Sequence, residues 1–476
     1  MKPFRVRLGL CAMGLLAAGL LAAGCALHEV EHGPPTLPGA FAAPRSATDA
    51  PWPDKNWYQA FGSAELSALI EQASSDNLDL SVARARVAQA DARARQAGAA
   101  ILPSVDAGGN GNYLAGHSAN GSAHETDWAA LLSASYEVDF WGKNRAAARS
   151  ASRLADASRA DRDTVALTTL AGVADGYFQV LSLRERLAIA TLNLNAAQKL
   201  LDIIQARFDV GLSNPVELAS QKAALATAGL VIPELKRQEA EALAALALLL
   251  GRAPEQFSVE SRSLDALLEP TIGSGIPAEL LTRRPDIFMA EANLKAANAD
   301  LFAARAALYP SLSLTASGGV QNPALNAAVI SLSGAGPTLN LGASLTQTIF
   351  DHGRLQAVRA EAQAKDDELV AAYKAAILSA LGDVENALSS VSRLQDARAL
   401  QEENVSQSER AFDGATLRYK AGSGDFLTVL EAQRTLYAAR DQFSQYRFAR
   451  FQALVALYKA LGGGWQAPTT PSKESR

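Results

Sequence analysis

The residue types that most often bind metals or catalyse reactions are scarce in this sequence. Its 476 residues include five histidines and two cysteines. His28 and His32 are four residues apart, but they fall in a Pro- and Ala-rich stretch without periodicity, which would not hold a set of three or four ligands in place. The phosphate-binding pattern GxxxxGK followed by Ser or Thr is absent. We therefore expect no metal, no cofactor and no catalytic site, and a protein that is not an enzyme.

The N-terminal segment ends in a motif that contains a cysteine, Cys25. A basic start and an apolar run from Leu8 to Leu21 are followed by small residues that lead to Cys25. This pattern is typical of a secretory signal peptide, here residues 1–24. The stretch LLAAGC resembles the signal of bacterial lipoproteins, which implies that Cys25 becomes the first residue and carries a lipid. Ala26 implies the outer membrane, since inner-membrane retention requires Asp there. An incidental cysteine after ordinary cleavage is the alternative.

The bulk composition excludes two further classes of protein. The net charge is −5 and Lys and Arg do not cluster, so we expect no binding to nucleic acid. After Leu21 no stretch approaches 18 consecutive apolar residues, so we expect no membrane-spanning helix. Residues 25–60 are rich in Pro and Ala near their start, which predicts an extended tether. Residues 467–476 are expected to form a disordered tail.

Two short motifs, RFDVGLSNPVEL and RYKAGSGDFLTV, begin 211 residues apart. In each, a glycine suits the left-handed cap at the end of a helix, and Asn or Asp three residues later suits the start of the next helix. The arginine could bond helix-end carbonyls, or it could simply compensate the helix dipole. Each motif therefore predicts a tight turn between two helices. The capping and bracing residues are Arg207, Gly211 and Asn214 in the first motif, and Arg418, Gly422 and Asp425 in the second.

Long stretches without proline lead into both motifs. They are rich in Ala, Leu, Glu, Arg and Gln, which favour helices. Roughly 65 helical residues would extend about 100 Å, which implies a coiled-coil-like bundle. We predict long helices at about 144–208 and 355–419. Turns at 209–214 and 420–425 and helices at 215–250 and 426–461 follow them.

Upstream of each long helix the pattern changes to strict alternation, which predicts β-hairpins at about 103–141 and 310–350. The Gly- and Asn-rich stretches 108–123 and 318–337 are expected to be loops. Strands with one apolar and one polar face fit a transmembrane barrel, although a soluble sandwich could show the same alternation. Four strands cannot close a barrel in lipid, whereas twelve from three chains can. The pattern therefore predicts a trimer.

These elements divide the chain into two similar halves. The first repeat spans 61–260 and the second 261–466, and the short helix of the second repeat is expected at about 285–307. Each has a short helix, a strand hairpin, a very long helix, a tight turn and another long helix. The expected fold class is mainly α with a small β part and an internal two-fold repeat.

The order of elements and several motifs resemble the TolC-like outer membrane factor family, in particular its efflux lipoproteins. The motifs are LLTRRPDI (280–287), YEVDFWGK (136–143), IFDHGRL (349–355), RYKAGSGDFLTVLEAQRTLY (418–437) and LYKALGGGW (457–465). The resemblance implies a homotrimeric tunnel, with a shared twelve-stranded β-barrel in the outer membrane and a barrel of long helices in the periplasm. The hairpin turns would lie at the periplasmic tip.

The resemblance also implies a function. The protein would be the exit duct of a tripartite multidrug efflux system, with a periplasmic adaptor and an inner-membrane transporter of the resistance–nodulation–division type as partners. Two alternatives are a duct for type I protein secretion, which shares the fold, and a structural coiled-coil lipoprotein without a pore. The lipoprotein signal and the motifs RRPDI and LYKALGGGW favour drug efflux.

The family's constricting apolar and acidic positions match Leu427 and Glu431. Three copies of Glu431 near one axis would repel each other and select for cations. The alternative is an acidic residue favoured by the helix dipole alone. Because the matching residues of the first repeat are Val216 and Ser220, only the second turn would supply the charge.

Overall fold

The computed structural model describes residue 33 and residues 36–42, 52–118, 121–273, 275–326 and 336–468. The signal peptide, Cys25 and much of the expected tether and tail lie outside them. The described chain is mainly helical with one small sheet, which confirms the expected fold class. It divides into a strand unit, which includes Arg86–Ser158 and Met289–Lys374, and a helical unit of Pro35–Ala85, Arg159–Phe288 and Ala375–Arg476.

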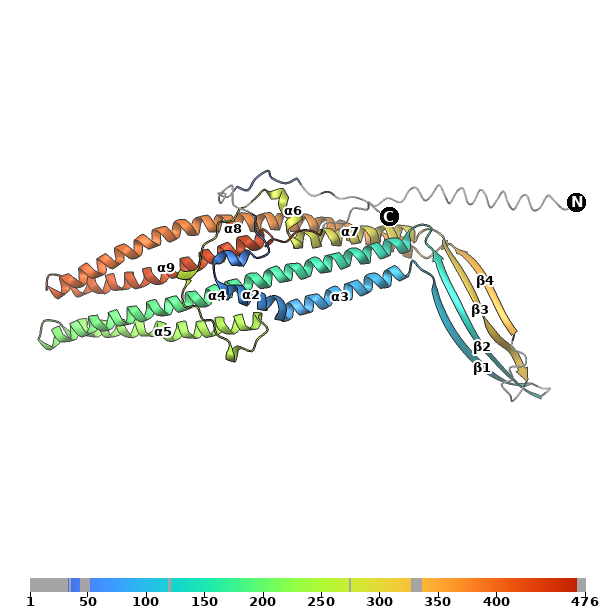
Figure 1. The fold of residues 1–476 in the computed structure, drawn as a ribbon, viewed down its shortest axis with the longest axis horizontal. Coiled ribbons are helices and arrows are strands. Elements are labelled where there is room, and N and C mark those ends of the chain that lie inside the picture. The colour runs from blue at the N-terminus through green and yellow to red at the C-terminus, as the bar shows by residue number, and fades with distance from the viewer. Residues whose placement is uncertain are drawn as a thin grey trace. The chain divides into compact units, whose positions relative to one another are not determined.

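The helices repeat in length as well as in order. The two longest have 67 residues each, about 100 Å of rise, and the helix that follows each has 35. Figure 1 shows each long helix turning back into its shorter partner. The α-helices are α2 (Ala64–Asp76), α3 (Leu78–Ala99), α4 (Lys143–Asp209), α5 (Pro215–Leu249), α6 (Leu280–Arg283), α7 (Pro285–Ala306), α8 (Arg354–Lys420) and α9 (Phe426–Ala460).

Side-chain bonds to main-chain carbonyls join the two helices of each hairpin. Gln221 of α5 donates to the carbonyl of Ala197 in α4 at 3.0 Å. Gln401 of α8 donates to the carbonyl of Ala439 in α9 at 2.8 Å. We call α4, its turn and α5 the first hairpin, and α8, its turn and α9 the second hairpin. Among the described residues, no helix is both long and apolar enough to cross a membrane.

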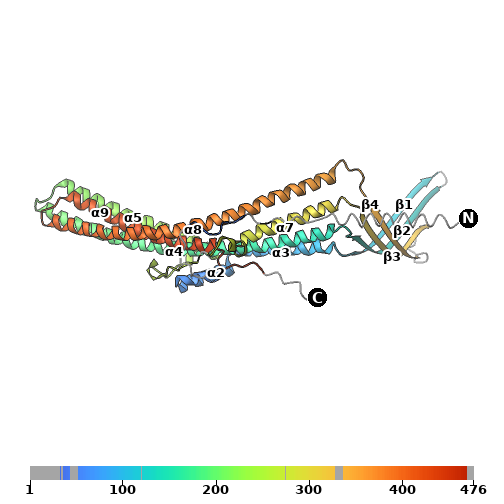
Figure 2. The same cartoon turned by 90° about the horizontal axis from the view of Figure 1, so that it is seen from above.

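The strand unit contains one antiparallel sheet in chain order, β1-β2-β3-β4. Figure 2 shows the same sheet from above. The strands are β1 (Ser104–Ser118), β2 (Gly121–Val138), β3 (Ser311–Asn326) and β4 (Gly336–Thr346). The strands extend well into the stretches expected as loops, so that part of the prediction is wrong. Two of the β1 glycines lie opposite large residues of β2, since Gly108 pairs with Leu131 and Gly111 with Trp128.

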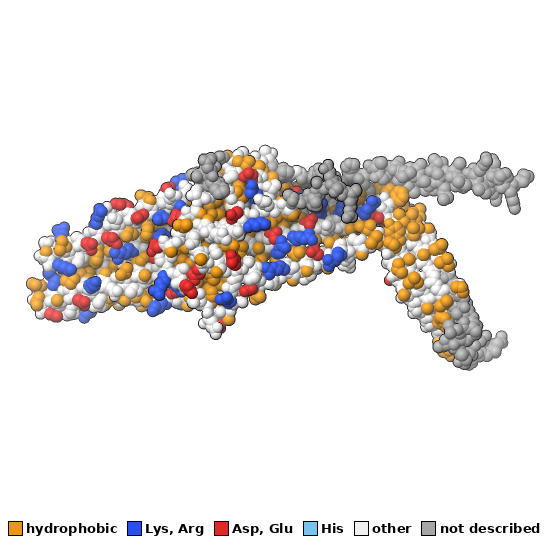
Figure 3. Space-filling model, viewed as in Figure 1, with side chains coloured by type: hydrophobic (Ala, Val, Ile, Leu, Met, Phe, Trp, Pro, Cys, Tyr) orange, Lys and Arg blue, Asp and Glu red, His pale blue; other side chains and the backbone are white. Residues whose placement is uncertain are grey.

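The register places side chains of one kind in rows across all four strands. Val105, Ala134, Ala316 and Leu341 form one row, and Asp106, Ser133, Ser317 and Asn340 form a row on the other face. The apolar rows stay exposed: Leu341 keeps 76% of its surface accessible and Leu339 75%. In Figure 3, orange and white atoms dominate the visible strands, whereas charged atoms gather over the helices. An exposed apolar face of this kind indicates a contact with lipid or protein.

The core of the helical unit is a cluster of aromatic rings. Phe61 packs against Phe178 of α4 and Phe451 of α9, with ring centroids 5.0 and 6.0 Å apart. Trp57 stacks on Tyr458 at 5.0 Å. Burying a large apolar side chain stabilises a fold by about 1.5–3 kcal/mol, so this cluster holds the segment before α2 against the middle of α4 and the C-terminal part of α9.

Candidate gate at the hairpin turns

The first turn closes through its backbone and one cap. After α4 ends at Asp209, Gly211 adopts a left-handed φ of 74°, and its N–H donates to the carbonyl of Phe208 at 3.0 Å. Asn214 then caps α5, since its Oδ1 accepts from the N–H groups of Val216 and Glu217 at 3.0 and 2.9 Å. Two otherwise unpaired amides of the helix start are thereby satisfied.

The second turn repeats this backbone. Gly422 has a φ of 75° and donates to the carbonyl of Tyr419 at 3.0 Å. Asp425 caps α9, accepting from the Thr428 N–H at 2.9 Å and from the Thr428 hydroxyl at 2.7 Å. These two bonds hold the pKa of Asp425 below its usual value, because they favour the charged carboxylate.

A polar link joins the first turn to the end of α8. The hydroxyl of Tyr419 donates to Glu217 Oε2 at 2.9 Å, and Ser213 Oγ donates to the same oxygen at 2.6 Å. Arg207 Nη1 donates to the carbonyl of Tyr419 at 3.1 Å, and its guanidinium lies 4.7 Å from the Tyr419 ring centre. Burial raises the pKa of Tyr419, and Glu217 adds to the rise. Tyr419 is only 3% exposed, whereas Ser213 and Glu217 are half-buried, so the link is partly shielded from water.

An apolar cluster beneath the link packs the two hairpins together. It combines residues of α4 and α5 with residues of α8 and α9, and Phe208 and Phe412 pack against it from its edge. Because this cluster and the polar link act on the same helix ends, separating the two hairpins within one chain would break both. The buried members are Leu200, Ile204, Leu218, Tyr419, Phe426, Val429 and Leu430.

The two arginines of the repeated motif behave differently. Arg207 bonds the carbonyls of Tyr419 and Leu212. The exposed guanidinium of Arg418 makes no hydrogen bond or ion pair with any described residue. The carbonyl of Arg418 instead accepts from the N–H groups of Ser423 and Gly424 at 2.9 and 3.1 Å. Bonding of helix-end carbonyls, one of the two roles considered for these arginines, is therefore seen for Arg207 and not for Arg418 among the described residues.

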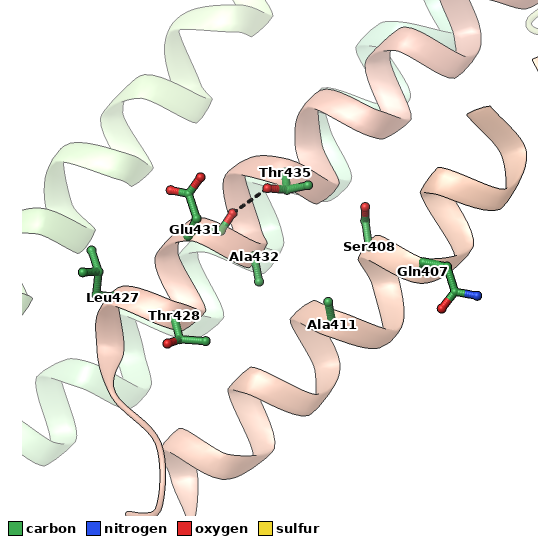
Figure 4. A pocket seen from close by; sticks show the side chains of 8 residues that line it. All are labelled: Gln407, Ser408, Ala411, Leu427, Thr428, Glu431, Ala432 and Thr435. Carbon is green, nitrogen blue, oxygen red and sulfur yellow. Dashed lines mark hydrogen bonds between the residues drawn. The ribbon is translucent and has the colours of Figure 1, made fainter. Parts of the chain in front are cut away.

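Leu427 and Glu431 lie one helical turn apart on α9, at the mouth of an open cavity of about 550 Å³. Figure 4 shows both side chains pointing away from α8, whereas Thr428 and Ala432 point toward it. Leu427 is 72% exposed. The Glu431 carboxylate has no partner among the described residues, so its charge is open to solvent. Val216, which matches Leu427 in the first repeat, is 73% exposed.

A separate cavity of about 580 Å³ in the helical unit contains one perturbed carboxyl group. Burial raises the pKa of Asp175 to about 7, and the positive charge of Lys459 opposes the rise. Its Oδ1 is buried and has no hydrogen-bond partner among the described residues. Neither turn contributes to this cavity, so Asp175 is not part of the candidate gate.

No three His, Cys, Asp or Glu side chains come together as a metal-binding group anywhere in the described ranges. Cys25, the expected lipid attachment site, lies outside these ranges. The gate candidates and the capping and bracing residues of the turns are thus the predicted site residues that lie within the described ranges.

The hydrogen bond between Tyr419 and Glu217 was not predicted from the sequence. A signal was present: on the 211-residue offset, Tyr419 replaces Phe208 and Thr428 replaces Glu217. Those two differences between the repeats mark the two ends of one hydrogen bond. A comparison of the motifs for their differences would have singled out both residues, although not their contact.

The sequence matches the family model "Outer membrane efflux protein" over residues 69–252 and 276–463. The pyoverdine export outer membrane protein OpmQ of Pseudomonas aeruginosa is 45% identical over 422 residues, which cover 87% of this chain and 88% of that protein. The cation efflux system protein CusC of Escherichia coli is 31% identical over 417 residues, 86% of this chain and 88% of that protein.

A solved structure shares the fold. The outer-membrane channel OprN superposes with a TM-score of 0.85 and 28% identity, covering 92% of this chain and all of that one. The family and these relatives are efflux and channel proteins rather than enzymes.

Proposed function

This chain belongs to the outer membrane efflux protein family, and we propose that three copies of it form the exit duct of a three-part efflux pump. The duct is passive. It carries substrate from the periplasmic side to the exterior without contact with lipid, and the energy comes from a partner. Lipid on Cys25 anchors each copy in the outer membrane.

One observation carries this proposal: the sheet has an exposed apolar face and two edge strands, β1 and β4. Edge strands present unpaired N–H and C=O groups, which are unfavourable in lipid unless another strand pairs with them. Three copies supply twelve strands, so that β4 of one copy pairs with β1 of the next. The apolar rows then face lipid and the polar rows face the pore.

The gate of the duct is formed by the second turn. Leu427 and Glu431 of three copies approach the axis, where the carboxylates repel one another and attract cations. The bond between Tyr419 and Glu217 supports a closed state, because the second hairpin cannot swing away from the first without breaking it. Opening therefore requires a partner that stabilises the separated hairpins.

The partners are a periplasmic adaptor, which binds the hairpin turns, and an inner-membrane transporter. The family resemblance implies a transporter of the resistance–nodulation–division type, driven by protons. Purifying the intact complex and identifying the transporter by mass spectrometry tests this. A transporter with a nucleotide-binding domain would replace the proton-driven one, and the absence of any transporter would contradict the three-part pump.

Pyoverdine, or an exported metabolite of that kind, is the substrate we propose first. The relative named for pyoverdine export is 45% identical, whereas the relative named for cation efflux is 31% identical. A range of drugs, as expected from the sequence alone, is the second candidate. A strain that lacks this chain should retain the metabolite in its periplasm if the first candidate is correct, and should gain only drug sensitivity if the second is.

Planar-bilayer recordings test the duct itself. The purified protein should give small, cation-selective events, and Glu431→Ala should enlarge them and reduce their selectivity. Glu402→Ala removes an equal charge from the exposed face of α8 and serves as the control. Absence of any conductance from the assembled protein would refute the duct.

A further inference from the structure

The cavity that contains Asp175 has charged groups from four parts of the helical unit. Asp175 lies on α4 and Asp383 on α8, while Lys459 lies on α9 and Arg284 directly before α7. Two of these groups neutralise each other, since Arg284 Nη2 donates to Asp383 Oδ2 at 3.0 Å. The same guanidinium also pairs with Asp286 at 2.6 Å. Among the described residues that line the cavity, the charged groups left without an ion pair are therefore Asp175 and Lys459.

Asp175 and Lys459 influence each other without being bonded. Oδ1 of Asp175 is buried and has no hydrogen-bond partner among the described residues, and the exposed ammonium group of Lys459 makes no ion pair with them. Burial raises the pKa of the Asp175 carboxyl to about 7, against the positive charge of Lys459, which lowers it. The cavity of about 580 Å³ leaves room for the flexible four-carbon stem of the lysine to turn inward.

The internal repeat shows that the fold does not require either group. On the 211-residue offset, Asp175 matches Asn386, which lines the same cavity. Asparagine has nearly the shape of aspartate, but its amide does not titrate. Lys459 matches Leu248, an exposed residue without a charge. A carboxyl group and an ammonium group therefore come together at only one of the two matching places.

We propose that Asp175 and Lys459 form a reversible tie between α4 and α9, which is closed when the carboxyl is ionised and open when it holds a proton. In the ionised state the ammonium group enters the cavity and donates to the carboxylate, because an unpaired charge is costly away from water. In the protonated state the carboxyl is neutral and Lys459 stays in solvent. The proton passes to and from water, and Lys459 keeps its charge throughout.

The tie joins the two hairpins far from their turns. Asp175 belongs to the first hairpin and Lys459 to the second, where it lies about 50 Å of helix away from Phe426. The pH of the surroundings therefore decides whether α4 and α9 are linked at this end. Because the closed tie stabilises the ionised carboxyl, it brings the midpoint of the titration to pH 7 or below.

Chemical modification of Lys459 tests whether the tie forms. In the purified full-length protein at about pH 8, an acylating reagent should modify Lys459 about tenfold faster in Asp175→Asn than in the wild type, as expected when one charge-assisted hydrogen bond is lost. The ratio of the two rates should fall toward one as the pH is lowered through the midpoint of the carboxyl. Mass spectrometry of the peptide that contains Lys459 measures both rates.

Two controls accompany this measurement. Lys420, at the exposed end of α8, should react equally in both proteins at each pH. Asp367→Asn removes an exposed carboxylate of α8, and Lys459 should then react as it does in the wild type.

Infrared difference spectra between acidic and alkaline protein report the carboxyl itself. The wild type should lose a band of a buried protonated carboxyl as the pH rises, and Asp175→Asn should lack that band. Lys459→Gln should move the midpoint upward by about 1–3 pH units, because it removes the nearby positive charge. Lys459→Arg, which keeps the charge, should return the midpoint close to the wild-type value.

The outcomes separate the tie from the proposed duct. Equal modification of Lys459 in the wild type and in Asp175→Asn at every pH would overturn the tie. A carboxyl band with the same midpoint in Lys459→Gln as in the wild type would overturn it as well. Neither experiment uses conduction or the assembly of three copies, so both results leave the duct standing. An assembled protein that conducts nothing overturns the duct and not the tie.

Discussion

The two hairpin turns share one backbone and differ in the side chains that surround it. Gly211 and Gly422 adopt nearly the same left-handed φ, and Asn214 and Asp425 cap the helices that follow. Around the first turn, Arg207, Ser213 and Glu217 are all bonded, and Tyr419 of the second hairpin completes the set. Around the second turn, Arg418 and Glu431 have no partner within the described chain.

The repeat therefore preserves the backbone geometry of the turn, whereas the side chains around the two turns make different contacts. The polar side chains around the first turn form hydrogen bonds within the chain, and these bonds hold the turn in place. At the second turn Asp425 and Thr428 bond each other, but the side chains of Arg418 and Glu431 stay available for neighbours, which suits a gate that must move. Substitutions at the two turns should therefore have unequal effects where the side chains differ and equal effects where the backbone is shared.

The largest effect is expected from Arg207→Ala. It removes two bonds to carbonyls and the contact with the Tyr419 ring, weakening the closed state by about 2 kcal/mol, roughly a thirtyfold shift in the closed-to-open ratio. Single-channel open probability measures the change. Lys199→Ala, an exposed charge two turns earlier on α4, is the control, and an equal leak in both variants would contradict the comparison.

Tyr419→Phe should have the next largest effect. It removes one hydroxyl and the bond to Glu217, which contributes about 1.5 kcal/mol because the acceptor is charged. Amide hydrogen exchange at residues 213–218 should accelerate about tenfold. Tyr437→Phe, which loses a hydroxyl bond to the carbonyl of Asn193 far from the turns, should leave that exchange unchanged. Faster exchange in both variants would mean general loosening rather than a local link.

Gly211→Ala and Gly422→Ala should destabilise the fold equally, by about 1 kcal/mol each. A Cβ at either position would meet no atom within 4 Å, so only the left-handed backbone opposes the substitution. Thermal unfolding of the two variants measures this. Clearly unequal shifts in melting temperature would show that the turns differ in backbone as well as in side chains.

The smallest effect concerns pH. The pKa of Asp425 is lowered in the folded state, so its stabilising contribution is present above the unfolded pKa and is lost as pH falls through the folded pKa. The stability difference between the wild type and Asp425→Asn should therefore shrink on acidification, whereas Asn214→Gln should show no such trend. Chemical unfolding between pH 7 and pH 3 measures both, and a constant difference for Asp425→Asn would argue against the charged cap.

Much of the fold could be predicted because it follows from local sequence. Ala-rich stretches without proline predict the helices, and the Gly and Asn or Asp pairs predict where they turn. Strict alternation predicts the four strands. The strand ends were less predictable, because Gly and Asn residues such as Gly111 and Asn112 are held in β1 by partners on β2. The spatial units also divide the chain differently from the two repeats, 61–260 and 261–466, which stay a prediction.

The candidate site was predictable only in part. Capping residues act on amides two or three positions away, so their partners are visible in the sequence. The bracing by Arg207 and the acceptor role of Glu217 depend on Tyr419, which lies about 200 residues later in the chain. No local sequence pattern predicts these two contacts. The roles of Leu427 and Glu431 stay a proposal, since they depend on neighbouring copies.

The amino-acid sequence by itself determined the helices, their caps, the alternation of the strands and the 211-residue repeat, because each depends on residues a few positions apart. Tertiary structure alone decided which of two matching faces is covered and which is open. Leu200 and Ile204 are buried in a cluster that includes Phe426 and Val429 of the second hairpin, whereas Ala411, which matches Leu200, is exposed and lines two open cavities. Contacts between distant segments depend on how whole hairpins pack, and packing is a property of the folded chain.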